Sequence, residues 1–174
     1  MPRIPYPSSE SPSKSDNVRT LNVQRMFHYV PDTMRIAFSA LAKELLWHGK
    51  LNPAYRELAI VHVGRLAGSD YELFHHEAFA RSVGVSDAKL DSLRRGDLVT
   101  GFTAAERAVL AFTDEVARKA RPSDSTLRDV QAHLSNGEIM ELILAFGYYM
   151  TVSRILETFG PEMDDIPLDT SPPK

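Results

Sequence analysis

The placement of proline restricts this chain to a helical fold more strongly than any other feature of its sequence. Eight of the eleven prolines lie near the two ends, and only Pro31, Pro53 and Pro122 fall between residues 13 and 160. Proline inside a helix costs about 3 kcal/mol, because it lacks an amide hydrogen and its ring clashes with the preceding turn. The central part is therefore free to form long helices. No long segment alternates between apolar and polar residues as a strand would.

Helix start signals recur through this central part. Asn52 and Pro53 fit an N-cap and a first helical position, and Gly68 fits the end of that helix. Other starts are indicated by capping boxes and weaker caps, which predict helices from Asp32 or Thr33 to about Trp47, over 87–95, from Thr103, over 124–134, and from Ser135. We predict an all-α protein, a compact helical domain of six to eight helices.

The length and the proline-rich ends indicate one domain with two arms. The 174 residues match one globular unit. We predict an N-terminal arm over 1–22, a helical domain over 23–162 and a C-terminal tail over 163–174. Both arms are expected to add little to the core of their own protomer, although either can lie across a partner subunit.

The charge balance argues against nucleic acid as a partner. Lys and Arg number 20 against 23 Asp and Glu, so the net charge of −3 lacks the basic excess that binding to a phosphate backbone requires. The first 20 residues have no apolar signal core, and no uncharged apolar run reaches 18 residues. We therefore expect a cytoplasmic protein that does not bind a membrane.

Ionisable side chains cluster between residues 57 and 76. Glu57 shares a helical stripe with apolar residues after Pro53, so its carboxylate is expected to be desolvated. It either pairs with a basic side chain such as Arg56 or has a pKa high enough to exchange protons. Glu72 and His76 are four residues apart on the next predicted helix and face the same side. They form either a solvated surface pair or a carboxylate that orients an imidazole.

The segment RELAIVHVGRLAGSDYELFHHEAFARSVGV resembles the signature helix pair of the carboxymuconolactone decarboxylase and alkylhydroperoxidase D superfamily. Redox members of that superfamily carry a glutamate, a Cys-x-x-Cys motif with a tyrosine usually before its second cysteine, and a histidine four residues later. Glu57, Tyr71 and His76 match the glutamate, tyrosine and histidine, whereas Ser69 and Glu72 fall on the cysteine positions. The stretch NGEIMELILAFGYYMTVSRILETFG is similar to the last long helix of the family, so the resemblance covers roughly residues 30–160.

The lost cysteines change what the resemblance implies about chemistry. The chain contains no cysteine, so it lacks the thiolate that peroxidase and disulfide chemistry require. The resemblance implies instead a lyase that performs proton transfer, by decarboxylation or isomerisation, on a small carboxylated lactone or aromatic-degradation intermediate, without metal or organic cofactor. His76, oriented by Glu72 or Glu57, would then protonate the dienolate left by loss of carbon dioxide.

Four further residues are candidates for substrate contact: Tyr71, Ser69, Arg56 and His48. Arg56 can bind a carboxylate, and the hydroxyls of Tyr71 and Ser69 can reach a carbonyl oxygen. Each has a structural alternative, because Arg56 can pair with Glu57, Ser69 can cap a helix, Tyr71 can pack in the core and an imidazole such as that of His48 can complement a helix end.

Two other classes of function remain open: a ligand-binding or scaffold protein that keeps only the fold, and a metal-assisted hydrolase that uses the local histidine and glutamate cluster. That cluster comprises His62, Glu72, His75, His76 and Glu77. Adjacent histidines point about 100° apart on a helix, which disfavours a shared ion.

The stretch around Glu141 predicts an oligomer. Apolar residues nearly encircle this part of the last predicted helix, which indicates burial against the core on one side and a second subunit on the other. Members of the family that this chain resembles assemble as trimers or hexamers, which implies a homo-oligomer here.

Overall fold

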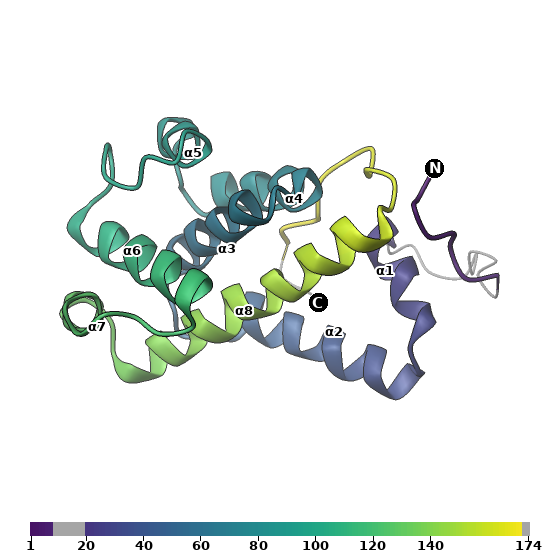
Figure 1. Cartoon of the computed structure of the whole chain (residues 1–174), viewed down its shortest axis with the longest axis horizontal. Helices are drawn as coiled ribbons and strands as arrows, with labels where there is room; N and C mark the ends of the chain where they lie inside the picture. Colours follow the sequence, from purple (N-terminus) through teal and green to yellow (C-terminus); the bar gives the residue numbers. More distant parts are fainter. Residues whose placement is uncertain (9–19, 172–174) are drawn as a thin grey trace.

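The computed structural model describes residues 1–8 and 20–171, and in these ranges every regular element is helical (Figure 1). The elements are α1 (Asn22–Met26), a 3-10 turn (Phe27–Tyr29), α2 (Asp32–Trp47), α3 (Pro53–Ala67), α4 (Asp70–Ser82), α5 (Asp87–Arg94), α6 (Ala104–Lys119), α7 (Asp124–Gln131) and α8 (Asn136–Phe159). The all-α prediction is confirmed, with eight α-helices in the described residues.

Helix α3 is the central element and packs against α4, α6 and α8. Its residues from Arg56 to Gly64 are all buried, as expected for a helix whose apolar side chains surround it. Gly68 ends α3 in the left-handed conformation, with φ of 68°, and its amide bonds back to the last turn. This turn returns the chain as α4 alongside α3. Gly64 permits their close approach, since a Cβ there would lie 3.2 Å from the Cβ of Glu72.

In the described residues, side-chain caps begin four of the eight α-helices: α3, α6, α7 and α8. The side chains of Thr103 and Ser135 form the expected capping boxes, and Asn52 accepts a hydrogen bond from the amide of Ala54. Ser86 begins α5 without a side-chain cap, and α7 ends three residues earlier than predicted, with Ala132 as its C-cap.

Helix α8 is the longest helix of the described residues and runs between α2 on one side and α3 and α6 on the other (Figure 1), while the C-terminal end of α2 contacts α3 and α4 directly. One side of it is buried against α3, whereas Met140, Ile143 and Leu144 are exposed, as are Met34 and Leu41 of α2. Among the described residues, α8 alone is long and apolar enough to cross a membrane by composition, and a packed core helix satisfies the same test. Contact of these exposed apolar side chains with a second subunit stays a prediction.

The C-terminal tail contributes more to the protomer than we expected. Asp164 is buried, and one of its carboxylate oxygens accepts a hydrogen bond from the Asn22 amide at 3.1 Å. Tyr71 of α4 also donates its hydroxyl hydrogen to Asp164, and the Leu168 amide donates to His75 Nδ1 at 2.9 Å. The tail is thus held by the α4 side chains that it covers. The parts of the two predicted arms at 9–19 and 172–174 lie outside the described residues.

Candidate functional site

His76 lies between two carboxylates in the interior of the protein. Its Nδ1 is 2.8 Å from Glu57 Oε2, and its Nε2 is 3.5 Å from Glu72 Oε2. Glu57 is fully buried, and the other two side chains are 4% exposed. Glu57 and His76 face each other because α3 and α4 are adjacent, and Glu72 faces His76 because four residues make about one helical turn. Glu57, Glu72 and His76 therefore form one compact cluster.

Arg56 neutralises the inner carboxylate of this cluster. Its Nε donates to Glu57 Oε1 at 2.8 Å, and its guanidinium also donates to the carbonyls of Leu46 at 2.8 Å and Leu45 at 3.4 Å. Both oxygens of Glu57 are therefore engaged, one by Arg56 and one by His76. Glu57 is fixed in place, and it holds the imidazole by Nδ1 so that Nε2 is the nitrogen free for chemistry.

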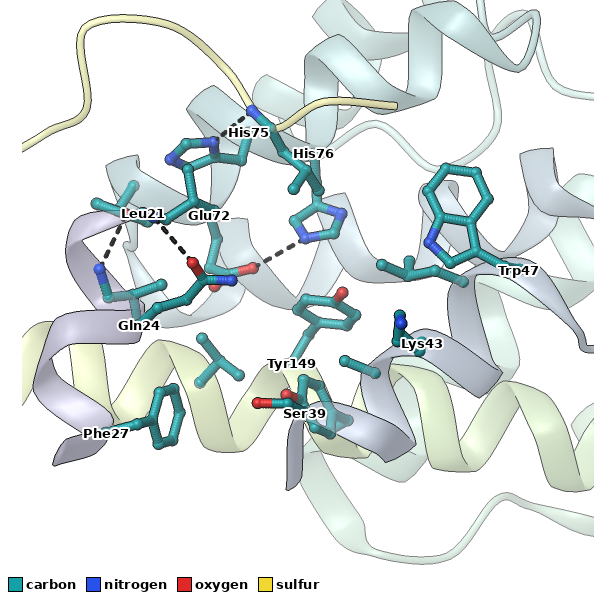
Figure 2. Close-up of a pocket in the computed structure, with 17 residues that line it drawn as sticks. Leu21, Gln24, Phe27, Ser39, Lys43, Trp47, Glu72, His75, His76 and Tyr149 are labelled. Atoms are coloured by element: carbon teal, nitrogen blue, oxygen red, sulfur yellow. Dashed lines mark hydrogen bonds and ion pairs between the residues drawn. The ribbon is translucent and has the colours of Figure 1, made fainter. Parts of the chain in front are cut away.

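Glu72 and His76 form part of the wall of a cavity of about 460 Å³. Residues from α1, α2, α4, α8 and the tail complete the wall, as Figure 2 shows. Most of these are apolar or aromatic: Leu21, Val23, Phe27, Ala42, Leu46, Trp47, Tyr71, Tyr148, Tyr149, Val152 and Leu168. The polar members are Gln24, Ser39, Lys43, Glu72, His75 and His76. A cavity of this size and lining suits a small, largely apolar ring with a few polar groups.

Burial and neighbouring charges prepare this cluster for proton transfer. Burial raises the pKa of Glu72 to about 7, with a further rise from Glu57, although the nearby imidazole opposes both. Burial lowers the pKa of His76, but the charge and hydrogen bond of Glu57 outweigh it, and the net pKa lies above its ordinary value. Both groups can therefore hold a proton near neutral pH.

Replacing Glu72 with glutamine is expected to make stability less dependent on pH. Because the pKa of Glu72 rises from 4.5 to about 7 on folding, the native state binds more protons than the unfolded state between these values. The free energy of unfolding of the wild type therefore falls as pH rises through this window. The difference in free energy of unfolding between Glu72→Gln and the wild type should therefore shift by about 1 to 3 kcal/mol in favour of the variant as the pH is raised from 5 to 8.

Urea denaturation of both proteins at pH 5 and pH 8 measures this change. The exposed Glu157 provides a matched control, and Glu157→Gln should follow the wild type at both values. A Glu72→Gln effect of the same size at pH 5 and pH 8 would contradict the elevated pKa.

The other predicted contact residues lie in different places. Tyr71 borders the cavity, but its hydroxyl is used by Asp164 and by the Val23 amide. Ser69 is fully buried, gives no side-chain cap and lies outside the cavity lining. Arg56 is turned toward Glu57. His48 is exposed, and its Nδ1 lies 3.2 Å from Glu44 Oε1. For Ser69, Arg56 and His48, the structure therefore does not bring the side chain to the cavity.

The histidines and glutamates proposed for a metal site point in different directions. His76 faces Glu57, whereas His75 Nε2 lies 3.2 Å from Asp164 in the tail. His62 contacts Asp114 on α6 at 2.9 Å, and Glu77 pairs with Arg94. Within residues 1–8 and 20–171, no three side chains of His, Cys, Asp or Glu are grouped so that they could hold an ion.

Several residues of the cavity carried no signal in the sequence. Lys43 and Trp47 lie on α2, and Tyr149 on α8, in stretches that resemble ordinary helix surface or core. Among the described residues that line the cavity, Lys43 is the one lysine or arginine. Only the packing of α2 and α8 beside α4 identifies these residues.

The fold and the site define a class: a compact all-α protein with a carboxylate–histidine–carboxylate cluster at the wall of a small cavity. Residues 31–115 match the model of the carboxymuconolactone decarboxylase family. The fold around this matched segment is that of alkylhydroperoxidase D-like proteins, and the chain has no cysteine. No curated protein matches the chain.

Solved structures with the same fold have sequences that differ widely from this one. A putative antioxidant defence protein AhpD from Agrobacterium tumefaciens has a TM-score of 0.70 and 22% identity, and the match covers 79% of this chain and 94% of that one. A peroxidase-related protein from Silicibacter sp. TM1040 has a TM-score of 0.74 and 18% identity, and the match covers 83% of this chain and 77% of that one. The debrominase Bmp8, as a cysteine-to-alanine variant with 2,3,4-tribromopyrrole, has a TM-score of 0.69 and 19% identity, over 84% and 79%.

Proposed function

We propose that this protein catalyses cofactor-free proton transfer, by decarboxylation or isomerisation, on a small carboxylated lactone or related intermediate of aromatic degradation. The observation that carries the proposal is the position of His76, which is held by Glu57 on one side and faces Glu72 and the cavity on the other. A buried imidazole with a raised pKa and a second buried acid beside it is an arrangement suited to general acid catalysis.

The reaction divides into bond cleavage and proton return. When the bond to the carboxylate carbon breaks, carbon dioxide leaves and the electron pair moves through the conjugated ring to the lactone carbonyl oxygen. His76 then transfers the proton on its Nε2 to the carbon of the substrate ring that lost carbon dioxide. Glu57 meanwhile keeps the imidazole oriented through the hydrogen bond at Nδ1. Glu72, whose pKa is about 7, returns a proton to Nε2 from water that enters the cavity.

The wall of the cavity supports a planar, anionic ring as the substrate. Trp47, Tyr148 and Tyr149 present aromatic surfaces, and Lys43 offers an ammonium group for a carboxylate. The structurally similar debrominase was solved with 2,3,4-tribromopyrrole, which is also a small planar ring. These features favour an aromatic-derived acid over a long-chain or strongly polar compound.

The same site gives no route to thiol chemistry. Ser69 and Glu72 stand at the two positions that carry cysteine in redox members, and the chain has no cysteine elsewhere. A hydroxyl or a carboxylate cannot pass through a sulfenate and a disulfide. The proposal therefore excludes peroxidase activity, although some structurally similar proteins are described as peroxidase-related.

The exposed apolar side chains of α2 and α8 support a homo-oligomer, proposed here as a trimer or hexamer. Met34, Leu41, Met140, Ile143 and Leu144 are each at least 36% exposed. Such a surface is typical of a subunit interface. We place this assembly in the cytoplasm.

The function is tested by incubating the wild type with a panel of carboxylated lactones in deuterated water. We expect loss of lactone absorbance, release of carbon dioxide and one deuterium in the product for at least one acid. The methyl ester of the same lactone is the matched control, because it cannot release carbon dioxide and should not turn over. Binding without turnover, seen as thermal stabilisation by the whole panel, would favour the ligand-binding alternative. Turnover that requires peroxide and a dithiol would contradict the proposal.

A further inference from the structure

Tyr149 is fixed directly beneath the imidazole of His76. The two rings meet edge to face, with centroids 4.2 Å apart and an interplanar angle of 70°. Tyr149 is 6% exposed and belongs to the main core cluster, where its ring packs among residues of α3, α4 and α8. Its position is therefore set by the same packing that holds His76.

The hydroxyl of Tyr149 is available to a ligand. In Figure 2 this oxygen points away from α8 toward the space between His76 and Trp47. No hydrogen bond joins it to any group in residues 1–8 or 20–171. Tyr71, the other buried tyrosine of this wall, instead uses its hydroxyl twice, with Asp164 and with the Val23 amide. A hydroxyl that borders a cavity without a protein partner is free to bond to whatever fills that cavity, so Tyr149 marks a point where a ligand can supply the partner.

Tyr149 remains protonated under all conditions of interest. Burial raises its pKa well above 10, and the carboxylates of Glu57 and Glu72 raise it further. The group is therefore a hydrogen-bond donor, and it does not compete with His76 or Glu72 as the proton source.

We propose that Tyr149 donates a hydrogen bond to the carbonyl oxygen of the bound ring compound and stabilises the enolate oxygen that forms during the reaction. This inference rests on the proposed function and deepens it. As carbon dioxide leaves, the electron pair of the broken bond comes to rest on this oxygen, and the proton from His76 then returns it to a carbonyl. The substrate must therefore be a cyclic compound whose carbonyl is conjugated with the carbon that receives the proton.

Replacing Tyr149 with phenylalanine tests this role, because only the hydroxyl is lost and the ring remains. We expect kcat to fall about 10²- to 10³-fold, the usual effect of removing one donor to a developing oxyanion. The KM should change little, since the donor acts most strongly on the charged transition state. The matched control is Tyr55→Phe, which removes the same atom from α3 outside the cavity lining and should keep the wild-type kcat.

A second measurement does not depend on turnover. The probe is 4-nitrophenol, a planar ring whose absorbance distinguishes phenol from phenolate. A donor aimed at its oxygen lowers the pKa of the bound probe, so the wild type and Tyr55→Phe should hold more of it as phenolate than Tyr149→Phe does. The expected difference in the pKa of the bound probe is about one to two units, as for a hydrogen bond to a charged group.

The two measurements separate this inference from the proposed function. If no lactone acid is turned over but the phenolate fraction depends on Tyr149, the role of Tyr149 as a donor to a ligand oxygen is supported and the proposed reaction is contradicted. If lactone acids are turned over and Tyr149→Phe keeps the wild-type kcat and phenolate fraction, the inference is overturned and the reaction stands. Failure of 4-nitrophenol to bind the wild type also overturns the inference.

Discussion

Replacement of His76 by alanine is expected to lower turnover about 10²- to 10⁴-fold, the usual contribution of a positioned acid or base. The imidazole Nε2 faces the cavity, and among the described residues no other group combines this position with a bond to Glu57. The protein should still fold, because Glu57 keeps its ion pair with Arg56. Glu72→Gln should lower turnover less, since an amide keeps the shape of the site but cannot return a proton.

Rates of lactone consumption for wild type, His76→Ala and Glu72→Gln measure these effects, after circular dichroism has shown that each protein is folded. His76→Gln is a second variant of closer size that retains a hydrogen-bonding group but has no titratable one, and it should be as inactive as the alanine variant. His133→Ala removes an exposed imidazole from outside the cavity and should leave the rate unchanged. Wild-type rates for His76→Ala would rule out His76 as the proton donor.

The central cluster could be predicted from the sequence because its geometry is mostly local. Glu72 and His76 are one helical turn apart, and Gly68 ends α3 so that α4 returns beside it. The position of Glu57 on an apolar stripe predicted its burial. Of the two interpretations offered for Glu57, the ion pair with Arg56 is present, and the contact with His76 is present as well, because the two carboxylate oxygens point to different partners.

The remainder of the site depends on packing between distant segments and left no local pattern. Lys43 and Trp47 enter the cavity because α2 lies across α8, and Tyr149 because the face of α8 beneath α4 is buried. Leu168 enters it because Asp164 fastens the tail to Tyr71, a contact between residues 93 positions apart. The position of His48 depends on the same packing: Trp47, the last residue of α2, lines the cavity, whereas the His48 imidazole that follows it lies in solvent beside Glu44.

Replacement of Glu57 by alanine is expected to destabilise the fold by about 3 to 5 kcal/mol, the usual cost of breaking a buried ion pair by removing one partner. Arg56 is 4% exposed, and without Glu57 its charge would remain in the interior with the carbonyls of Leu45 and Leu46 as its hydrogen-bond acceptors and no carboxylate to balance it. His76 would lose the acceptor that raises its pKa. Urea denaturation at pH 7 measures the change, and Glu157→Ala on exposed α8 surface is the control that should change little.

The double variant Arg56→Met with Glu57→Leu distinguishes an uncompensated charge from a simple loss of packing. If the cost of Glu57→Ala comes from the stranded guanidinium, removing both charges should restore much of the stability, because apolar side chains of similar volume can replace a buried pair. If both proteins are equally unstable, the carboxylate contributes through its bond to His76 and not through Arg56. The double variant should be folded but inactive, because no carboxylate would then hold His76 Nδ1. That outcome would show that Glu57 contributes to stability through Arg56 and to activity by positioning the proton donor, as two separate effects.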